Sequence, residues 1–188
     1  MIILGIDPGS RFLGFAVLEV SSTQPRSILG SHQLDMKAIE YGVLKFNAEE
    51  NLSQRLLEIG EGVRDLMKSY KPDQMSLEKI FLGKNADSAF KLGHARGVVV
   101  YEALKSNVEV FEYATRVVKK GITGNGGAEK EHVRLVIQNL LKLPPVKSLD
   151  ASDALAMACF HATQLRFNSL KKELKAQAKK SIKGDLAV

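Results

Sequence analysis

Residues 2–9 read Ile-Ile-Leu-Gly-Ile-Asp-Pro-Gly, an apolar strand that ends in a carboxylate and a turn. Burying an unpaired carboxylate costs several kcal/mol, so Asp7 must face water, pair with a cation or bind a metal ion. The pattern recurs at Glu78, within the apolar run 75–81, and at Asp150 and Asp153, which open the apolar run 154–160. If these three segments converge, their oxygens form a pocket suited to a hard divalent cation such as Mg²⁺.

Each of these acids also has an ordinary structural explanation. Asp7 fits a turn residue, Asp150 a helix N-cap and Asp153 the third residue of a capping box. Glu78 fits such an explanation least well, because apolar residues flank it on both sides. Asp150 and Asp153 would share one helix face and repel each other unless a cation lies between them. Taken together, the four acids favour a metal site.

Length and composition indicate one globular domain. The 188 residues, 45% hydrophobic and 26% charged, predict a single domain over 1–170 and a basic tail over 171–188 that extends the last helix or is disordered. The lone Cys159 excludes an intrachain disulfide and a cysteine-based zinc site. No signal peptide or apolar run of about 18 residues is present, so we expect a cytoplasmic protein without a membrane span.

The formal net charge of +6 is unevenly distributed. Residues 164–188 hold seven Lys or Arg against two Asp or Glu, a net charge of +5, and the remaining 163 residues carry +1. Within that body, residues 79–134 hold ten basic against six acidic residues. This middle stretch is therefore the better candidate for a surface that binds a polyanion.

The periodicity of apolar residues predicts an α/β layer with a mixed sheet. We expect strands over 2–7, 12–20, 27–34, 74–81 and 108–113, and helices over 47–70, 87–104, 129–141 and 150 to about 170. The glycine-rich stretch 121–127 predicts a flexible loop. It lacks the Gly-Lys-Ser/Thr ending of a phosphate-binding P-loop and does not directly follow a strand, so we reject that assignment. The four histidines show no metal-ligand spacing among themselves, and the sequence leaves the roles of His94 and His161 open.

Several blocks of the chain, in order from residue 1 to about 162, closely resemble the RuvC family of Holliday-junction resolvases. Asp-Pro-Gly alone would be a weak signal, whereas the whole set is specific. The blocks are Ile3–Arg11, Glu78–Phe81, Lys84–Ala89, Lys91–Gly97, Phe111–Ala114, Ala128–Lys130 and Asp150–Ala156. The basic tail lies outside the resemblance.

The resemblance implies a ribonuclease H-like fold with a mixed five-stranded sheet flanked by helices. It also implies a homodimer that resolves four-way DNA junctions in recombination and repair by paired symmetric nicks. Asp7, Glu78, Asp150 and Asp153 would then hold the metal, with two Mg²⁺ per site expected and Mn²⁺ as an alternative. Hydrolysis of this kind leaves a 5′-phosphate and a 3′-OH, and a branch-migration helicase of the RuvAB type is an implied partner.

The same resemblance assigns candidate DNA contacts. Phe81 resembles an aromatic that stacks on an unpaired base near the junction centre, although the alternation of residues 74–81 fits a core position equally well. Lys119 and Lys130 match basic positions near the scissile phosphate, and Lys84, Arg116 and Lys120 are further candidates. A surface lysine more often serves only solubility, so these assignments depend on the resemblance.

The helix over 87–104 is a candidate dimer interface. Its small residues Ala89, Gly93 and Gly97 recur every four residues and form a groove. Such a groove admits the backbone of a second copy or packs on the protein's own sheet, and the sequence leaves both possibilities open. A two-fold homodimer would supply two matched active sites for a junction with two-fold symmetry.

Three rival functions remain. An actin-like ATPase or sugar-kinase lobe also begins with a strand and Asp-x-Gly, but 188 residues are too few for its two lobes. A related RuvC-like nuclease acting on RNA would cut structured RNA in preference to junctions. An inactive DNA-binding module would show no Mg²⁺-dependent nicking, and the presence of all four acids argues against it.

Overall fold

The computed structural model describes residues 1–22, 34–79 and 86–185, with side chains up to residue 168. Its centre is a five-stranded mixed sheet in the spatial order β3-β2-β1-β4-β5. The strands are β1 (Ile2–Asp7), β2 (Phe12–Ser22), β3 (Leu34–Lys45), β4 (Gln74–Glu78) and β5 (Glu109–Tyr113). β1, β2 and β3 form an antiparallel meander, whereas β4 and β5 pair in parallel with β1 and with each other.

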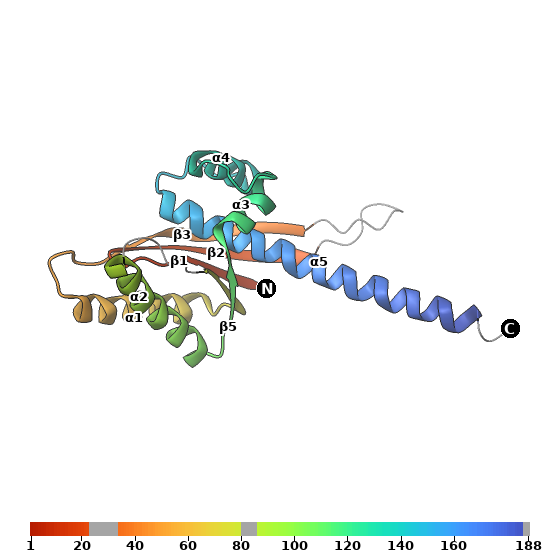
Figure 1. Cartoon of the computed structure of the whole chain (residues 1–188), viewed down its shortest axis with the longest axis horizontal. Coiled ribbons are helices and arrows are strands. Elements are labelled where there is room, and N and C mark those ends of the chain that lie inside the picture. The colour runs from red at the N-terminus through yellow and green to blue at the C-terminus, as the bar shows by residue number, and fades with distance from the viewer. Residues whose placement is uncertain (23–33, 80–85, 186–188) are drawn as a thin grey trace.

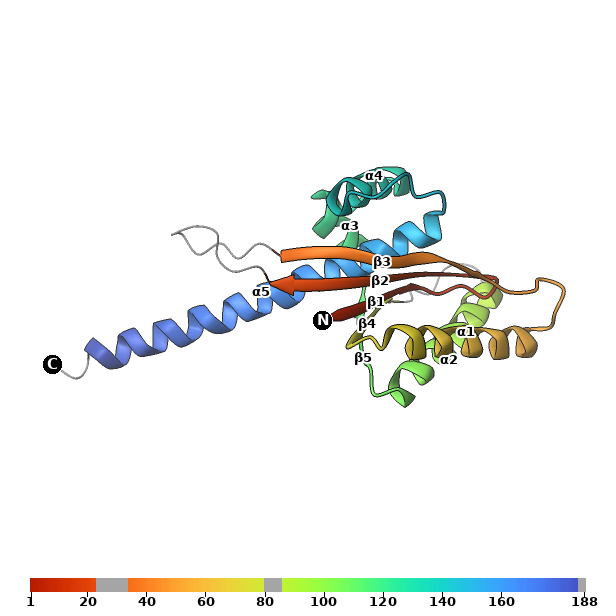
Figure 2. The same cartoon turned by 180° about the vertical axis from the view of Figure 1, so that it is seen from behind.

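Helices cover both faces of the sheet (Figures 1 and 2). One face carries α1 (Leu52–Tyr70) and α2 (Ala86–Lys105), and the other carries α3 (Thr115–Thr123), α4 (Lys130–Leu141) and α5 (Leu149–Asp185). Each face has its own hydrophobic core, because side chains alternate between the two faces of a strand. The predicted mixed five-stranded sheet flanked by helices is thus present.

The first half of α5 is the central helix of its layer. Ala151, Ala154 and Ala158 are buried against the sheet. A Cβ atom at Gly5 would lie 2.2 Å from the Ala154 carbonyl oxygen, and one at Gly14 would lie 2.1 Å from that of Asp150. Only glycine allows α5 to approach β1 and β2 this closely.

The third strand lies elsewhere than the sequence predicted. We expected it over 27–34, but β3 spans Leu34–Lys45, and residues 27–33 lie outside the described part of the chain. β3 is an edge strand, and a register shift between Val17 and Leu18 leaves Ile39 without a partner. That bulge interrupts the two-residue alternation by which a strand is recognised in sequence.

Other boundaries differ by a few residues. α1 begins at Leu52 rather than near residue 47, because Asn51 is its N-cap and accepts a hydrogen bond from the Gln54 amide. The stretch 121–127, predicted to be a loop, begins inside α3, which ends at Thr123 and is capped by Gly124 in a left-handed conformation. Within the described residues, no helix is both long and apolar enough to cross a bilayer.

Candidate active site

Four carboxylates lie at one end of the sheet. Asp7 is the last residue of β1 and Glu78 the last residue of β4, and these strands are parallel neighbours. Glu78 belongs to the strand predicted for it, but β4 ends at Glu78, before the predicted end at residue 81. Asp150 and Asp153 lie in the first turns of α5, whose backbone rests on Gly14, opposite Asp7 in the β1–β2 ladder.

Asp7 experiences the other three carboxylates directly. Burial raises the pKa of Asp7, and the negative charges of Asp153, Glu78 and Asp150 raise it further, to about 8, although Lys130 partly opposes them. A carboxyl in this setting holds its proton at neutral pH unless additional positive charge is present. The protein's own groups therefore supply too little positive charge to keep Asp7 ionised at neutral pH.

One ammonium group reaches into this acidic cluster. Lys130, the first residue of α4, donates a hydrogen bond of 2.6 Å to Asp153. Partial burial alone would lower the pKa of Lys130, but the hydrogen bond to Asp153 and the charges of Asp153, Asp7 and Asp150 outweigh it and raise the pKa. Even with Asp7 protonated, one ammonium group against three other carboxylates leaves the cluster negative.

Glu78 is held by a residue that the sequence analysis missed. The hydroxyl of Thr115, the first residue of α3, donates a hydrogen bond to Glu78 Oε1. Tyr113 precedes Thr115 by two residues, and its hydroxyl lies 2.7 Å from Nδ1 of His161. Nε2 of the same histidine lies 3.0 Å from Gln74 Oε1. The only available signal was position, since Thr115 follows a predicted strand that is the neighbour of the strand carrying Glu78.

The histidines that the sequence left open now have places. His161 is fully buried, and burial lowers its pKa to about 4, so it is neutral and serves the core network with Tyr113 and Gln74. His94 lies on α2, with Nδ1 2.8 Å from the Phe90 carbonyl oxygen. Neither histidine lies among the four carboxylates.

The donor set fits a hard divalent cation. Four carboxylates, one of them with its pKa raised by burial and by its neighbours, provide only oxygen ligands. As placed, no three His, Cys, Asp or Glu side chains within the described ranges surround a common point as a finished metal site. Asp153 and Glu78 instead turn toward Lys130 and Thr115, as expected for mutually repelling acids that take the nearest hydrogen-bond donor.

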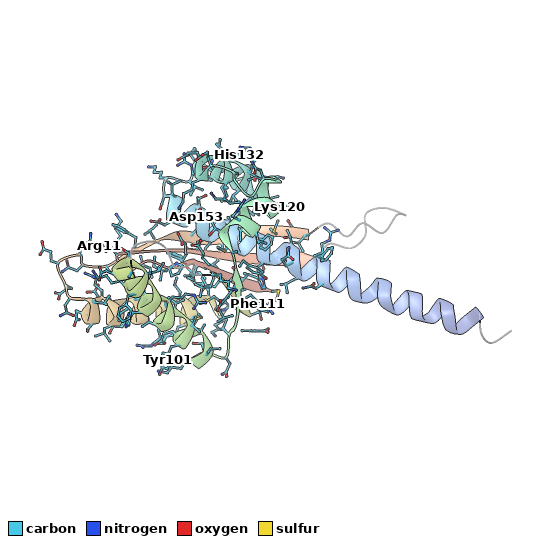
Figure 3. The ribbon with its side chains drawn as sticks, viewed as in Figure 1. Arg11, Tyr101, Phe111, Lys120, His132 and Asp153 are labelled. Carbon is cyan, nitrogen blue, oxygen red and sulfur yellow. The ribbon has the colours of Figure 1, made fainter. Side chains whose placement is uncertain are left out.

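Basic residues on α3 lie beside this site. Arg116 and Lys120 are exposed and line a hollow of about 810 Å³ together with the glycines of the loop that follows α3. Figure 3 shows Lys120 and Asp153 on the same side of the sheet. Lys119 is half-buried and donates a hydrogen bond of 2.7 Å to the Ala128 carbonyl, so in this structure its ammonium group fastens α3 to that loop.

Two predicted DNA contacts, Phe81 and Lys84, lie outside the described residues. The choice between a stacking and a core role for Phe81 therefore stays open, and so does the phosphate contact predicted for Lys84.

Known proteins resemble this chain over most of its length. The family model described as "Crossover junction endodeoxyribonuclease RuvC" matches residues 3–161. The chain belongs to the RuvC family. A RuvC from Bdellovibrio bacteriovorus is 49% identical over 170 residues, covering 90% of this chain and 95% of that protein. A RuvC from Pseudoalteromonas atlantica is 39% identical over 98% of both chains.

Solved structures of the family share the fold. Thermus thermophilus RuvC superposes with a TM-score of 0.77 at 29% identity, covering 89% of this chain and 97% of that one. A second structure, of T. thermophilus RuvC in complex with a Holliday junction substrate, gives a TM-score of 0.76 at 27% identity, covering 89% and 96%. The prediction of a ribonuclease H-like RuvC fold is thereby confirmed.

Proposed function

We propose that this protein is a metal-dependent endodeoxyribonuclease that resolves four-way DNA junctions by paired symmetric nicks. The observation that carries the proposal is the convergence of Asp7, Glu78, Asp150 and Asp153 at one end of a RuvC fold, with the pKa of Asp7 raised by the other three. A RuvC relative with 27% identity was solved with a Holliday junction substrate, which supports the same substrate here.

The four carboxylates would hold two Mg²⁺ ions, with Mn²⁺ as an alternative. Two such ions, when bound, stabilise the attacking and leaving oxygens of an in-line displacement and lower the pKa of the attacking water. β1 and β4 fix two of the ligands on a rigid sheet, and α5 fixes the other two. We expect products with a 5′-phosphate and a 3′-OH, so nicked arms should be resealed by DNA ligase without further processing.

Basic groups beside the carboxylates would hold the DNA. Lys130 lies between the acidic cluster and solvent with its side chain 51% exposed, so its ammonium group is placed to contact the scissile phosphate when a metal ion relieves Asp153. Arg116 and Lys120 offer two further positive groups on α3, and Lys119, Lys84 and Phe81 complete the proposed set. Phosphate contacts of this kind make binding fall steeply with salt.

We also propose that α2 forms the interface of a homodimer. Ala89, Gly93 and Gly97 line an open groove of about 860 Å³, and no atom of the described residues lies within 4 Å of a Cβ built at either glycine. The protein's own sheet therefore does not fill this groove. Phe90 and Tyr101 border it and are 68% and 59% exposed, so the groove presents apolar surface that a second copy could bury.

The dimer can be tested by sedimentation with a charge placed in the groove. Gly97→Arg should convert the dimer to monomer, because the new side chain fills the space that a second copy would occupy. Gly127→Arg, on the exposed loop after α3, is a matched control and should leave the dimer intact. A wild-type protein that sediments as a monomer at all accessible concentrations contradicts the proposal.

The expected domain bounds and cytoplasmic location rest on the sequence, and the expected partner rests on membership of the RuvC family. Residues 1–170 would form the nuclease domain and 171–188 a basic extension. The protein would act in the cytoplasm beside a branch-migration helicase of the RuvAB type.

The decisive experiment compares nicking of a synthetic four-way junction with nicking of linear duplex of the same sequence, in Mg²⁺ and in EDTA. Paired nicks at symmetric positions, in the junction only and only with Mg²⁺, support the proposal. Cleavage of structured RNA in preference to the junction would transfer the activity to the RNA-directed rival. Mg²⁺-independent binding without any nicking would indicate an inactive DNA-binding module.

A further inference from the structure

A second hollow adjoins the carboxylates on the side away from β4. It measures about 620 Å³ and lies between the start of β2, the end of β3 and the segment that leads into α5. Asp150, one of the four carboxylates, also lines this hollow, so the hollow borders the acidic cluster. Its walls include Phe12, Tyr41, Val43, Lys45, Lys147 and Asp150. We call it the Phe12 groove.

Strand register explains why these side chains meet. Phe12 pairs with Lys45, Gly14 with Val43 and Ala16 with Tyr41 in the β2–β3 ladder. Residues two apart in a strand share a face, so these pairs lie on the face that α5 covers, just beyond the first turn of α5. Arg11, next to Phe12, lies at the same end of the sheet (Figure 3).

Phe12 is placed as a contact rather than as a core residue. Its side chain is 51% exposed, although Leu13 beside it is fully buried. Exposing the ring forfeits burial free energy that a core position would supply. A half-exposed ring at the rim of an acidic active site suits a ligand with a flat apolar face.

The charges of the groove specify the rest of that ligand. Lys45 and Lys147 are exposed, and within the described residues neither ammonium group makes an ion pair or a hydrogen bond. Two uncompensated cations beside one aromatic ring are the combination by which proteins bind single-stranded nucleic acid, with phosphates on the cations and a base on the ring. An uncharged ligand would leave both ammonium groups unused.

We propose that the Phe12 groove binds the nucleotide that flanks the scissile phosphate on the cleaved strand. The base stacks on Phe12, and its neighbouring phosphates pair with Lys45 and Lys147. Stacking requires a base that has left its duplex neighbour, which a strand crossing over at a junction provides. This inference rests on the proposed nuclease function and extends it.

The groove is distinct from the contacts assigned by family resemblance. β4 lies on one side of β1, and β2 and β3 lie on the other. Arg116, Lys119 and Lys120 belong to α3 and do not line the Phe12 groove, whereas Phe81 lies outside the described residues. The groove therefore adds a second flank to the active site and lets the protein hold the cleaved strand on both sides of the cut.

The test uses full-length protein and a junction whose thymines near the cut are replaced one at a time by 5-iododeoxyuridine. Binding is measured in EDTA, where nothing is cut, and nicking is measured separately in Mg²⁺. Phe12→Leu keeps an apolar side chain of similar size but removes the ring, and Phe12→Tyr keeps the ring. Phe167→Ala is the control, since Phe167 is 61% exposed and lies on α5 well beyond its first turns.

We expect Phe12→Leu to weaken junction binding by about 5- to 160-fold, the typical effect of losing one stacked base, while Phe12→Tyr and Phe167→Ala bind as wild type does. Photo-crosslinking in EDTA should join one iodouracil position to Phe12. Lys45→Gln and Lys147→Gln should each lower the slope of log affinity against log salt by about 0.7, as for single-strand phosphate contacts. Lys37→Gln, at the far end of β3, should not change the slope.

The outcomes separate this inference from the proposed function. Equal binding by wild type and Phe12→Leu, with no crosslink at Phe12, overturns the groove assignment even if junction nicking is normal. A protein that binds and crosslinks through Phe12 in EDTA but never nicks keeps the groove and overturns the nuclease. If Phe12→Leu and Phe12→Tyr lose binding equally, Phe12 acts through packing, and the stacking role is wrong.

Discussion

The pKa of Asp7 reflects the charge of every other carboxylate in the site. It lies at a strand end, is largely enclosed, and has three carboxylates near enough to help raise its pKa to about 8. Such a position is unfavourable in the absence of a cation and favourable with one, which is why a single acid after an apolar strand was informative in the sequence. The same argument separates its effect on chemistry from its effect on DNA binding.

Asp7→Asn should reduce nicking by a factor of about 100 or more, because it removes a metal ligand at the reacting centre. Junction affinity in EDTA should be unchanged or higher, since the substitution removes negative charge close to a phosphate. Nicking and binding assays on the same preparation check this. Equal losses of affinity and nicking would mean that Asp7 supports folding rather than metal binding.

His161 should make the stability of the protein depend on pH. Its folded-state pKa of about 4 lies below the ordinary value of about 6.5, so the unfolded chain binds the proton first as the pH falls. Stability should therefore decline as the pH drops from about 6.5 to about 4, by at most about 3 kcal/mol from this residue. Below the folded-state pKa both states are protonated, and His161 adds no further decline.

Denaturant unfolding at several pH values would measure this contribution. His161→Phe keeps an aromatic ring of similar volume and should show a weaker decline than wild type over the same range. His132→Gln, on the exposed surface of α4, should follow the wild-type curve. Parallel curves for wild type and His161→Phe would show that the buried imidazole titrates no differently in the unfolded chain.

At the scale of elements, the position of α5 depends on two glycines. Gly14 lets the first turn of α5, with Asp150, rest directly on β2, because a Cβ atom there would lie 2.1 Å from the Asp150 carbonyl oxygen. Backbone is the obstacle, so no side-chain rotation can relieve the contact. The backbone of β2 therefore sets the position of Asp150 and Asp153, the two carboxylates on α5.

Gly14→Ala should displace the first turn of α5 and lower nicking more than it lowers junction binding. It should also destabilise the fold by about 1–3 kcal/mol, the usual range for overpacking. Gly42→Ala is the matched control, because the Cβ atom would meet only the Phe15 ring, at 3.2 Å, and a side chain can yield. Thermal unfolding and nicking assays measure both effects, and identical nicking by the two variants would contradict this account of α5.

Some elements of the fold could be predicted from the sequence and others could not. Strands β1 and β4 were predictable because each is a short, mainly apolar run, and Asp7 was noticeable because it is a charged residue at the end of such a run. Helix α2 was predictable because small residues recur in it every four positions. β3 was not, since it is a half-exposed edge strand with a bulge at Ile39. Thr115 and the Phe12 groove were not either, because both arise from register and packing between segments that are distant in sequence.

At the scale of the whole molecule, α5 has two parts. Its first half is packed against the sheet, and the helix then continues to Asp185, beyond the sheet and away from the other elements (Figures 1 and 2). The family model ends at residue 161, so the extension lies outside the part of the chain that the model matches. Fifteen helical residues from 171 to 185 span about 22 Å, which is nearly three times the screening length of about 8 Å in physiological salt.

Deleting residues 171–188 should therefore weaken junction binding and flatten its salt dependence, because the deletion removes six lysines against two acids. Nicking at low salt should survive, since all four carboxylates and the Phe12 groove remain. A variant with Gln at the six lysines from 171 to 183 separates charge from length, and it should bind as weakly as the deletion does. Anisotropy titrations over a range of salt measure the slopes. If the glutamine variant binds as wild type does while the deletion binds more weakly, the extension acts through contacts other than phosphate pairing. If neither change alters the affinity, the extension is not part of the DNA interface.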